Sequence, residues 1–347
     1  MGRDTQLSER KAAILRALVR HYIHTGEPVA SEALAGESGL SVSSATIRGE
    51  LAALEELGYL TQPHTSAGRA PTDLAYRYYV DLLPARSRLR DPERRAIVHF
   101  FDEALEDIDE ILRGTTHLLS RLTRYASLAL APSPREESIA RAELVAVGTG
   151  TLLLLVFESG RVEKRLVDLP PTLTSDDLGR LSAGTLQTFH AKTVAAARSV
   201  AADLAKTSGE PDRAVFAGMA DALAALEEAS EAEHVIMGGV ANIAADEAFH
   251  GRETLRQIYE TLERESAILR LLREAAATSP VAVMIGRENP LPEMWEASFI
   301  AATYGAGGGA VGTIGVVGPT RMDYGAAITA VRAVAERLSA AVEALRA

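Results

Sequence analysis

The stretch SVSSATIRGELAALEELGYLTQPHTSAGRAPTDLAYRYYVD, residues 41–81, joins an amphipathic helix to a polar loop without acidic residues. Ile47, Leu51 and Leu54 are spaced by four and then three residues, so they fall on one side of a helix. This spacing predicts a helix that buries one stripe in a core.

The opposite side of that helix is bare. It carries only small residues, which are Ala45, Gly49 and Ala52. Thr46 and Arg48 flank them, and no large side chain would hold a neighbouring backbone away. We therefore expect that a nucleic-acid groove can approach this face closely.

Serines precede the helix at positions 41, 43 and 44, where an N-cap is expected. The free N–H groups of a helix start attract phosphate oxygens. Glu55 and Glu56 lie at the far end of the helix, where they would repel DNA least. The pattern predicts that the start of the helix faces the nucleic acid.

A candidate wing follows the helix. Gly58 ends the helix, and residues 59–61 are typical of a short strand that leads into the polar loop 62–69. No Asp or Glu occurs in 38–49 or in 57–72, although acids are plentiful elsewhere. We predict DNA contacts from Ser43, Ser44, Thr46 and Arg48 of the helix, and from Gln62, His64, Thr65, Ser66 and Arg69 of the loop.

The order of elements favours this interpretation. A capped amphipathic helix beside a Gly/Pro loop also occurs in ordinary globular domains. Upstream, however, residues 7–26 have apolar side chains at helical spacing, and residues 29–38 predict a second short helix. Helix, short helix, turn, helix and wing is the order of a winged helix-turn-helix.

Composition limits the other possibilities. With 347 residues, 47% of them hydrophobic, the chain is long enough for two or three domains. It has no cysteine, no run of 18 apolar residues and no signal-peptide pattern, so we expect a cytoplasmic protein with no membrane partner. Its net charge is −11, of which residues 1–83 hold −2 (eight Lys/Arg, ten Asp/Glu). Operator binding would then need base contacts and dimerisation rather than bulk charge.

The rest of the chain predicts an α+β fold. Five arginines lie in residues 84–95, which we interpret as a linker that could also touch the phosphate backbone. Helical spacing from 96 to 130 predicts one long helix or two, with Gly114 as a break and Pro132 and Pro134 as the end. Strand-like runs follow at 143–148, 151–158, 161–169, 281–285, 297–304 and 311–317, and residues 322–345 predict a closing helix. A long helical block separates the two groups of strands, which indicates a sheet split by an insertion.

Six segments carry a resemblance to a known family, and they are SSATIRGELAALEELGYL (43–60), PHTSAGRAPTD (63–73), YRYYVDLL (76–83), VIMGGVANIA (235–244), ENPLPEMWEASFIAATY (288–304) and GTIGVVGPTRMDYGAAI (312–328). In these segments the chain resembles the HrcA family, the heat-inducible repressors of bacterial chaperone operons. One position departs from the family, which usually has Asn after the TIR triplet where this chain has Gly49. A glycine inside a helix costs about 1 kcal/mol relative to alanine, and it removes one possible base contact.

The resemblance implies an architecture and a function. The domains would be a winged helix at 1–83, the linker at 84–95, a GAF-like domain at 96–171 and 266–347, and an inserted dimerisation domain at 172–265. The protein would bind an inverted-repeat operator before chaperone genes as a homodimer. Chaperonin would help the repressor reach its active fold, and heat would relieve repression by depleting active repressor.

We expect neither enzymatic activity nor a cofactor or metal. Residues 307–312 match GxGxxG, but a strand-like run follows them, whereas a phosphate-binding loop needs a helix N-terminus there. His21 and His24 lack a third metal ligand nearby, and no Ser-His-Asp order is evident. Asn242 and Glu247 beside a Gly-Gly pair suggest a polar pocket or, equally, a capped turn. The alternatives are a regulator whose GAF-like domain senses a small ligand, and an enzyme that uses the glycine-rich loop.

Overall fold

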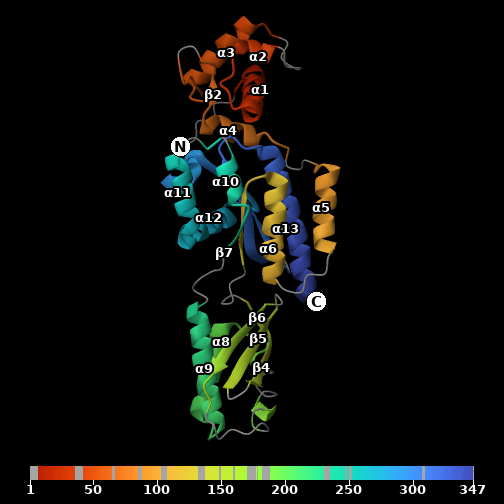
Figure 1. Ribbon diagram of the computed structural model, residues 1–347, viewed down its shortest axis with the longest axis vertical. Coiled ribbons are helices and arrows are strands. Elements are labelled where there is room, and N and C mark those ends of the chain that lie inside the picture. The colour runs from red at the N-terminus through yellow and green to blue at the C-terminus, as the bar shows by residue number, and fades with distance from the viewer. Residues whose placement is uncertain are drawn as a thin grey trace.

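The computed structural model describes residues 7–35, 42–64, 67–84, 88–102, 108–131, 137–147, 150–158, 161–169, 177, 179–181, 188–229, 235–246, 248–249, 252–306 and 309–346. Three units follow one another along the long axis (Figure 1). We call them the head (described residues within 7–84), the body (within 88–131 and 235–346) and the lobe (within 137–229). In the described part, no helix is long and apolar enough to cross a membrane.

The head contains four helices and a two-stranded hairpin. They are α1 (Glu9–Thr25), α2 (Ser31–Ala35), α3 (Ser44–Glu56), β1 (Leu60–Thr61), β2 (Ala70–Pro71) and α4 (Asp73–Asp81). The predicted stripe of α3 is buried at 0–4% exposure and packs against Ile14, Leu15 and Leu18 of α1. Ser8 caps the start of α1, and Gly26, with φ +73°, ends it. A helix, a short helix, a third helix and a hairpin thus follow one another in the described head.

The body is built on a five-stranded antiparallel sheet with the order β7-β3-β10-β9-β8. Its strands are β3 (Ala126–Leu130), β7 (Val235–Gly238), β8 (Val281–Ile285), β9 (Ala297–Ala306) and β10 (Gly309–Pro319). Neighbouring residues of β9 belong to two different cores, Phe299 to one and Ile300 to the other. Both faces of the sheet therefore contribute side chains to a core.

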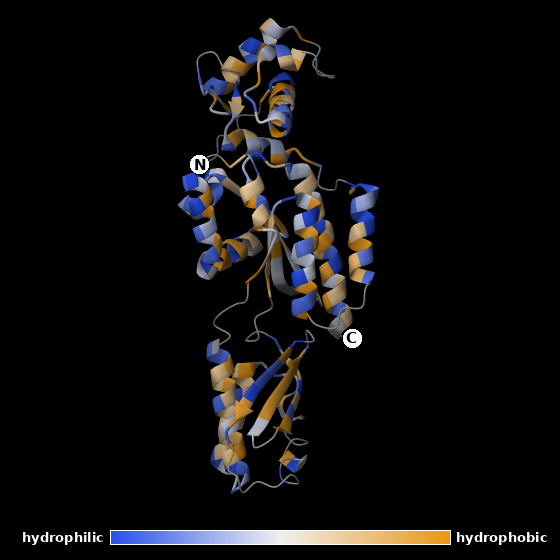
Figure 2. Cartoon of the chain, in the orientation of Figure 1, coloured by the Kyte–Doolittle hydropathy of each residue, from blue (hydrophilic) through white to orange (hydrophobic). Residues whose placement is uncertain are grey.

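Helices cover the two faces of this sheet (Figure 1). One side carries α5 (Asp91–Asp102), α6 (Ile108–Thr123) and α13 (Tyr324–Arg346), and the other carries α10 (Ala241–Ala245), α11 (Arg252–Glu263) and α12 (Glu265–Thr278). Two short 3-10 turns, η1 (Gly286–Glu288) and η2 (Pro292–Met294), connect β8 to β9. Hydrophobic and hydrophilic residues alternate along these helices (Figure 2), as is typical of helices with one buried face.

The lobe is a separate small sheet with two helices on one side. Strands β4 (Ile139–Val147), β5 (Gly150–Phe157) and β6 (Val162–Val167) pair antiparallel in that order. The helices α8 (Val194–Thr207) and α9 (Asp212–Ala229) cover the face that carries Leu153, Leu155 and Phe157. The three consecutive antiparallel strands predicted from the sequence are confirmed.

Two expectations for the body were wrong. Residues 126–130 form strand β3, not the end of a helix, and all five are buried. When an apolar run is buried on both sides, its hydrophobic residues show no periodicity that distinguishes a helix from a strand. Gly114 lies inside α6 and does not break it. The glycine lets α5 approach closely, since a Cβ there would lie 2.6 Å from ring atoms of Phe100. Pro132 and Pro134 lie outside the described residues.

The expected division of the sheet also differs from the structure. The sequence predicts that residues 139–167 belong to the GAF-like segment 96–171, but they form their own sheet. Strand β7 and helix α11 lie in the expected insertion 172–265, but both belong to the body. Leu130 of β3 pairs with Val235 of β7, so the chain leaves the body and returns at neighbouring strands. Strand pairing across a hundred residues has no local signal in the sequence.

Residues 309–312 of the glycine-rich segment belong to strand β10, which pairs antiparallel with β9. Gly309 of β10 pairs with Ala306 of β9, and residues 307 and 308 lie outside the described part. The chain continues as a strand rather than as a helix, which is the outcome expected from the sequence. Asn242 donates to the Ser120 hydroxyl at 3.0 Å and to the Tyr125 carbonyl at 3.3 Å, so it ties α10 to α6 and to the residue that precedes β3.

Candidate nucleic-acid interface

The start of α3 is capped and open to solvent. Ser43 has extended backbone angles, and its side chain accepts a hydrogen bond from the Thr46 amide at 3.2 Å. The hydroxyl groups of the two residues lie 3.0 Å apart. Ser44 is the first helical residue and is half-buried. The predicted N-cap is confirmed, and the first turn presents backbone N–H groups at the surface.

The outer face of α3 is bare, as its spacing predicts. Ala45, Gly49 and Ala52 are exposed, and a Cβ added at Gly49 would meet no atom within 4 Å. Nothing in the described head packs against this face. The major groove of DNA is wide enough to admit an α-helix. This face of α3 can therefore enter such a groove without the displacement of a large side chain.

Arg48 extends from the same face, and its side chain is 76% exposed. Its guanidinium lies 2.9 Å from a carboxylate oxygen of Glu32 on α2. A hydrogen bond from its own backbone lowers the pKa of Glu32, and the charge of Arg48 lowers it further. The sequence gives no sign of this partner, because the pairing depends on how α2 packs beside α3.

The loop between β1 and β2 is closed by its own hydrogen bonds. Gln62 donates from its side-chain amide to the Ala67 carbonyl at 2.9 Å, and the Ala67 amide donates to the His64 carbonyl at 2.9 Å. Gln62 is half-buried, whereas His64 is exposed. Thr65 and Ser66, which were expected to contact DNA, lie outside the described residues. His64 is thus the predicted loop residue that the structure places on the surface.

Arg69 turns toward the end of α3. Its Nε lies 2.8 Å from a carboxylate oxygen of Glu55, and the side chain is only 21% exposed. Its backbone N–H and C=O exchange hydrogen bonds with Val29, both at 2.9 Å. Arg69 therefore anchors the base of the loop to α3 and to the segment before α2.

A hollow of about 340 Å³ lies between α2, α3 and the loop. Its lining includes three predicted contact residues, Arg48, Gln62 and Arg69, together with Glu32. Ser43, Ser44 and Thr46 lie at the start of α3. The structure therefore arranges the predicted residues along one helix and one loop, with an acidic side chain between them.

Known proteins match this chain over nearly its whole length. The family model described as HrcA protein C terminal domain matches residues 109–328. A heat-inducible transcription repressor HrcA from Nocardioides sp. (strain ATCC BAA-499 / JS614) is 40% identical, with 95% of this chain and 97% of the relative covered. The chain belongs to the HrcA family. The family resemblance found in the sequence is thereby confirmed.

Two further matches extend the comparison. A protein of the same name from Nocardia farcinica (strain IFM 10152) is 38% identical, with 96% of each chain covered. A crystal structure described as a hypothetical protein superposes with a TM-score of 0.68 and 24% identity, covering 98% of this chain and all of the other. This structure supports the mixed α and β fold. The HrcA name of the relatives assigns this chain to transcription repression and not to catalysis.

Proposed function

We propose that this HrcA-family repressor is a winged-helix protein that places α3 in the major groove of an inverted-repeat operator. The observation that supports this most directly is the outer face of α3: capped, free of large side chains and carrying an exposed arginine. The hairpin loop would lie beside the phosphate backbone as the wing. Binding would require no change in the core of the head.

The roles of the residues follow from their places. Arg48 would contact a guanine or a phosphate, Ser43, Ser44 and Thr46 would contact neighbouring bases or phosphates, and His64 would contact the backbone. For Thr65 and Ser66, the prediction from the sequence that they contact DNA from the wing is unchanged. Gln62 and Arg69 would act mainly by shaping the loop, because their side chains bond within the head.

Arg48 is available for DNA although it is paired. The Arg48–Glu32 pair is exposed on both sides, with 76% and 63% of the side chains accessible. Exposed ion pairs stabilise a protein by about 0–1 kcal/mol. A phosphate or a guanine edge would replace the carboxylate of Glu32 at little cost.

The lobe offers the surface for a homodimer. Its sheet has one face without a helix among the described residues, and Val145, Leu152 and Leu166 form a cross-strand row on it. Leu166 is 75% exposed. A row of exposed apolar side chains of this kind favours association, and a two-fold axis would bring two copies of it together. Two heads would then match the symmetry of an inverted repeat.

The decisive experiment measures DNA binding by fluorescence anisotropy. The purified protein is titrated with an inverted-repeat chaperone promoter, with a version that has scrambled half-sites, and over a series of salt concentrations. We expect Arg48→Ala to weaken operator binding by about 1–3 kcal/mol if Arg48 contacts a base. Equal loss on both DNAs would make Arg48 a phosphate contact, and no loss on either would refute its role.

Glu32→Gln is the matched control for that experiment. It breaks the same ion pair but leaves Arg48 in place, so it should bind operator at least as tightly as the parent protein. Weaker binding by Glu32→Gln would mean that the ion pair, and not a DNA contact, explains the effect of Arg48→Ala.

A ligand-sensing regulator was the second candidate from the sequence. Both faces of the body sheet are filled with apolar side chains, and the buried Tyr304 hydroxyl donates to the Leu130 carbonyl at 2.8 Å. This packing favours a structural role for the body. The dependence on chaperonin and the chaperone-gene operator stay predictions from the family resemblance.

A further inference from the structure

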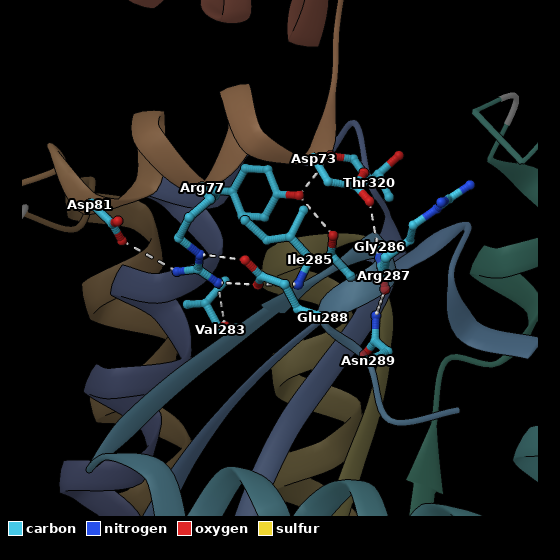
Figure 3. A network of polar contacts seen from close by, with 12 residues as sticks. Asp73, Arg77, Asp81, Val283, Ile285, Gly286, Arg287, Glu288, Asn289 and Thr320 are labelled. Carbon is cyan, nitrogen blue, oxygen red and sulfur yellow. Dashed lines mark hydrogen bonds and ion pairs between the residues drawn. The ribbon is translucent and has the colours of Figure 1, made fainter. Parts of the chain in front are cut away.

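The head is joined to the body by a compact polar network around α4 (Figure 3). Arg77 of α4 donates from Nε to a carboxylate oxygen of Glu288 at 2.8 Å, and its Nη2 contacts the second oxygen. The same Nη2 donates to the Val283 carbonyl at 2.6 Å, and Nη1 donates to Asp81 at 3.3 Å. One guanidinium thus bonds to α4, to β8 and to η1.

The partner carboxylate is itself held in place. Glu288 accepts a hydrogen bond from the Ile285 amide at 2.9 Å, so its side chain is fixed against its own turn. This bonding to Glu288 also raises the pKa of Arg77, which stays fully charged. Neither partner can rotate without losing a second hydrogen bond.

Asp73, at the start of α4, forms the second part of the network. Its carboxylate accepts a hydrogen bond from the Arg287 amide at 3.0 Å. Gly286 has φ +50°, and a Cβ there would overlap the carboxylate of Asp73. The backbone of the body comes so close to α4 that only glycine fits.

A third contact lies on the other side of the head. Arg321 packs against Gly26 at the end of α1, where a Cβ would lie 2.7 Å from its Nη1, and it donates to the Ile23 carbonyl at 3.5 Å. Between these contacts, the rings of Tyr76 and Tyr324 lie 5.8 Å apart. The head is therefore held at more than one point.

Polar and apolar contacts contribute differently to such a junction. Burial of apolar surface has no preferred direction. A guanidinium that bonds a carboxylate through two nitrogens has a fixed plane and angle. The orientation of the head consequently depends on Arg77, Glu288 and Asp73. The packing of the tyrosines stabilises the contact between head and body but does not fix its angle.

We propose that Asp73, Arg77 and Glu288 form a junction latch, a set of positioning residues that fixes the angle of the head on the body. In a dimer this angle sets the distance between the two α3 helices, and therefore the half-site spacing that the repressor accepts. The proposal rests on the proposed function for its effect on operator binding. The angle itself can be measured without DNA.

The first test compares an operator with two half-sites to a duplex with one. Loosening the latch should weaken binding to the full operator at least about tenfold, because the effective concentration of the second head falls, while half-site binding stays within about twofold. The variants are Arg77→Ala and Gly286→Ala, which disturb the latch from opposite sides. Equal loss on both duplexes would overturn the proposal.

Arg256→Ala is the matched control. Arg256 of α11 also pairs with two carboxylates, those of Glu253 and Glu260, but both partners lie on α11 itself. It should leave both affinities unchanged. The unfolding midpoint and far-ultraviolet circular dichroism check each variant, and Arg77→Gln replaces Arg77→Ala if the alanine variant does not fold.

The second test measures the head angle directly. The chain has no cysteine, so Glu56→Cys on α3 and Ala340→Cys on α13, both exposed positions, give one spin-label pair per chain. Labelled protein is mixed with excess unlabelled protein, and the distance distribution is recorded. We expect a narrow distribution in the parent and a broader one in both latch variants.

The two tests separate the proposals. An unchanged distribution in the latch variants would overturn the latch. A broadened distribution in the latch variants, together with a parent protein that fails to bind operator, would support the latch and reject the proposed operator binding.

Discussion

Gly49 lowers the stability of α3, and no contact in the described structure compensates for this loss. It lies in the middle of the helix, and a side chain there would meet no atom within 4 Å. We expect Gly49→Ala to raise the free energy of unfolding by about 0.5–1 kcal/mol, since alanine loses less backbone entropy. Urea denaturation measures this. An unchanged or lower value would mean that the helix is distorted at this position.

The exposed side of α3 could be predicted from the sequence, but its surroundings could not. The spacing of Ile47, Leu51 and Leu54 fixes which residues point outward, so the exposure of Arg48 follows from the helix period. Its partner Glu32 lies sixteen residues away on another helix. The partner of Arg69 could not be predicted for the same reason. A loop arginine is expected at the surface, and only the packing of the head brings its side chain to Glu55.

At the scale of elements, the hairpin loop depends on a close approach of two backbones. A Cβ at Gly68 would lie 2.5 Å from the Val29 carbonyl oxygen and 2.6 Å from that of Pro28. We expect Gly68→Ala to lower the free energy of unfolding by about 1–3 kcal/mol, the usual cost of overpacking. It should also weaken DNA binding, because the loop must move.

Urea denaturation and anisotropy test this prediction together, with Gly209→Ala in the lobe as the control, because a Cβ at Gly209 would meet no atom within 4 Å. If Gly68→Ala left both the stability and the affinity unchanged, the loop would not be anchored to the segment before α2 as the structure shows.

The elements themselves were largely predictable, and their partners were not. Helices with one buried stripe and strands bounded by turns carry their period in the sequence, as α13 and β5 do. The strand 126–130 lacks such a period because both of its sides are buried. The separate sheet of the lobe and the Arg77–Glu288 pair, 211 residues apart, follow from long-range packing that local patterns do not encode.

At the scale of the whole molecule, the open face of the lobe should decide the oligomeric state. Leu166 is 75% exposed and lies opposite Leu152 on this face. We expect Leu166→Lys to convert a dimer into a monomer, because an interface cannot bury two unpaired ammonium groups. Its effect on chain stability should stay within about 0.5 kcal/mol, as for other surface substitutions.

Analytical ultracentrifugation measures the mass, and Leu74→Lys is the control, since Leu74 is also exposed but lies on the head. A Leu166→Lys protein that remained a dimer would place the interface elsewhere and leave this face without a role in assembly.

The pairing of Leu130 with Val235 also has a meaning for the history of the chain. The two ends of the lobe segment meet at adjacent strands, so a short turn would close the body in its absence, and the lobe has its own core. A segment with these properties can be gained, lost or exchanged without rebuilding its host. The way copies associate could thus have changed independently of the way each copy recognises DNA.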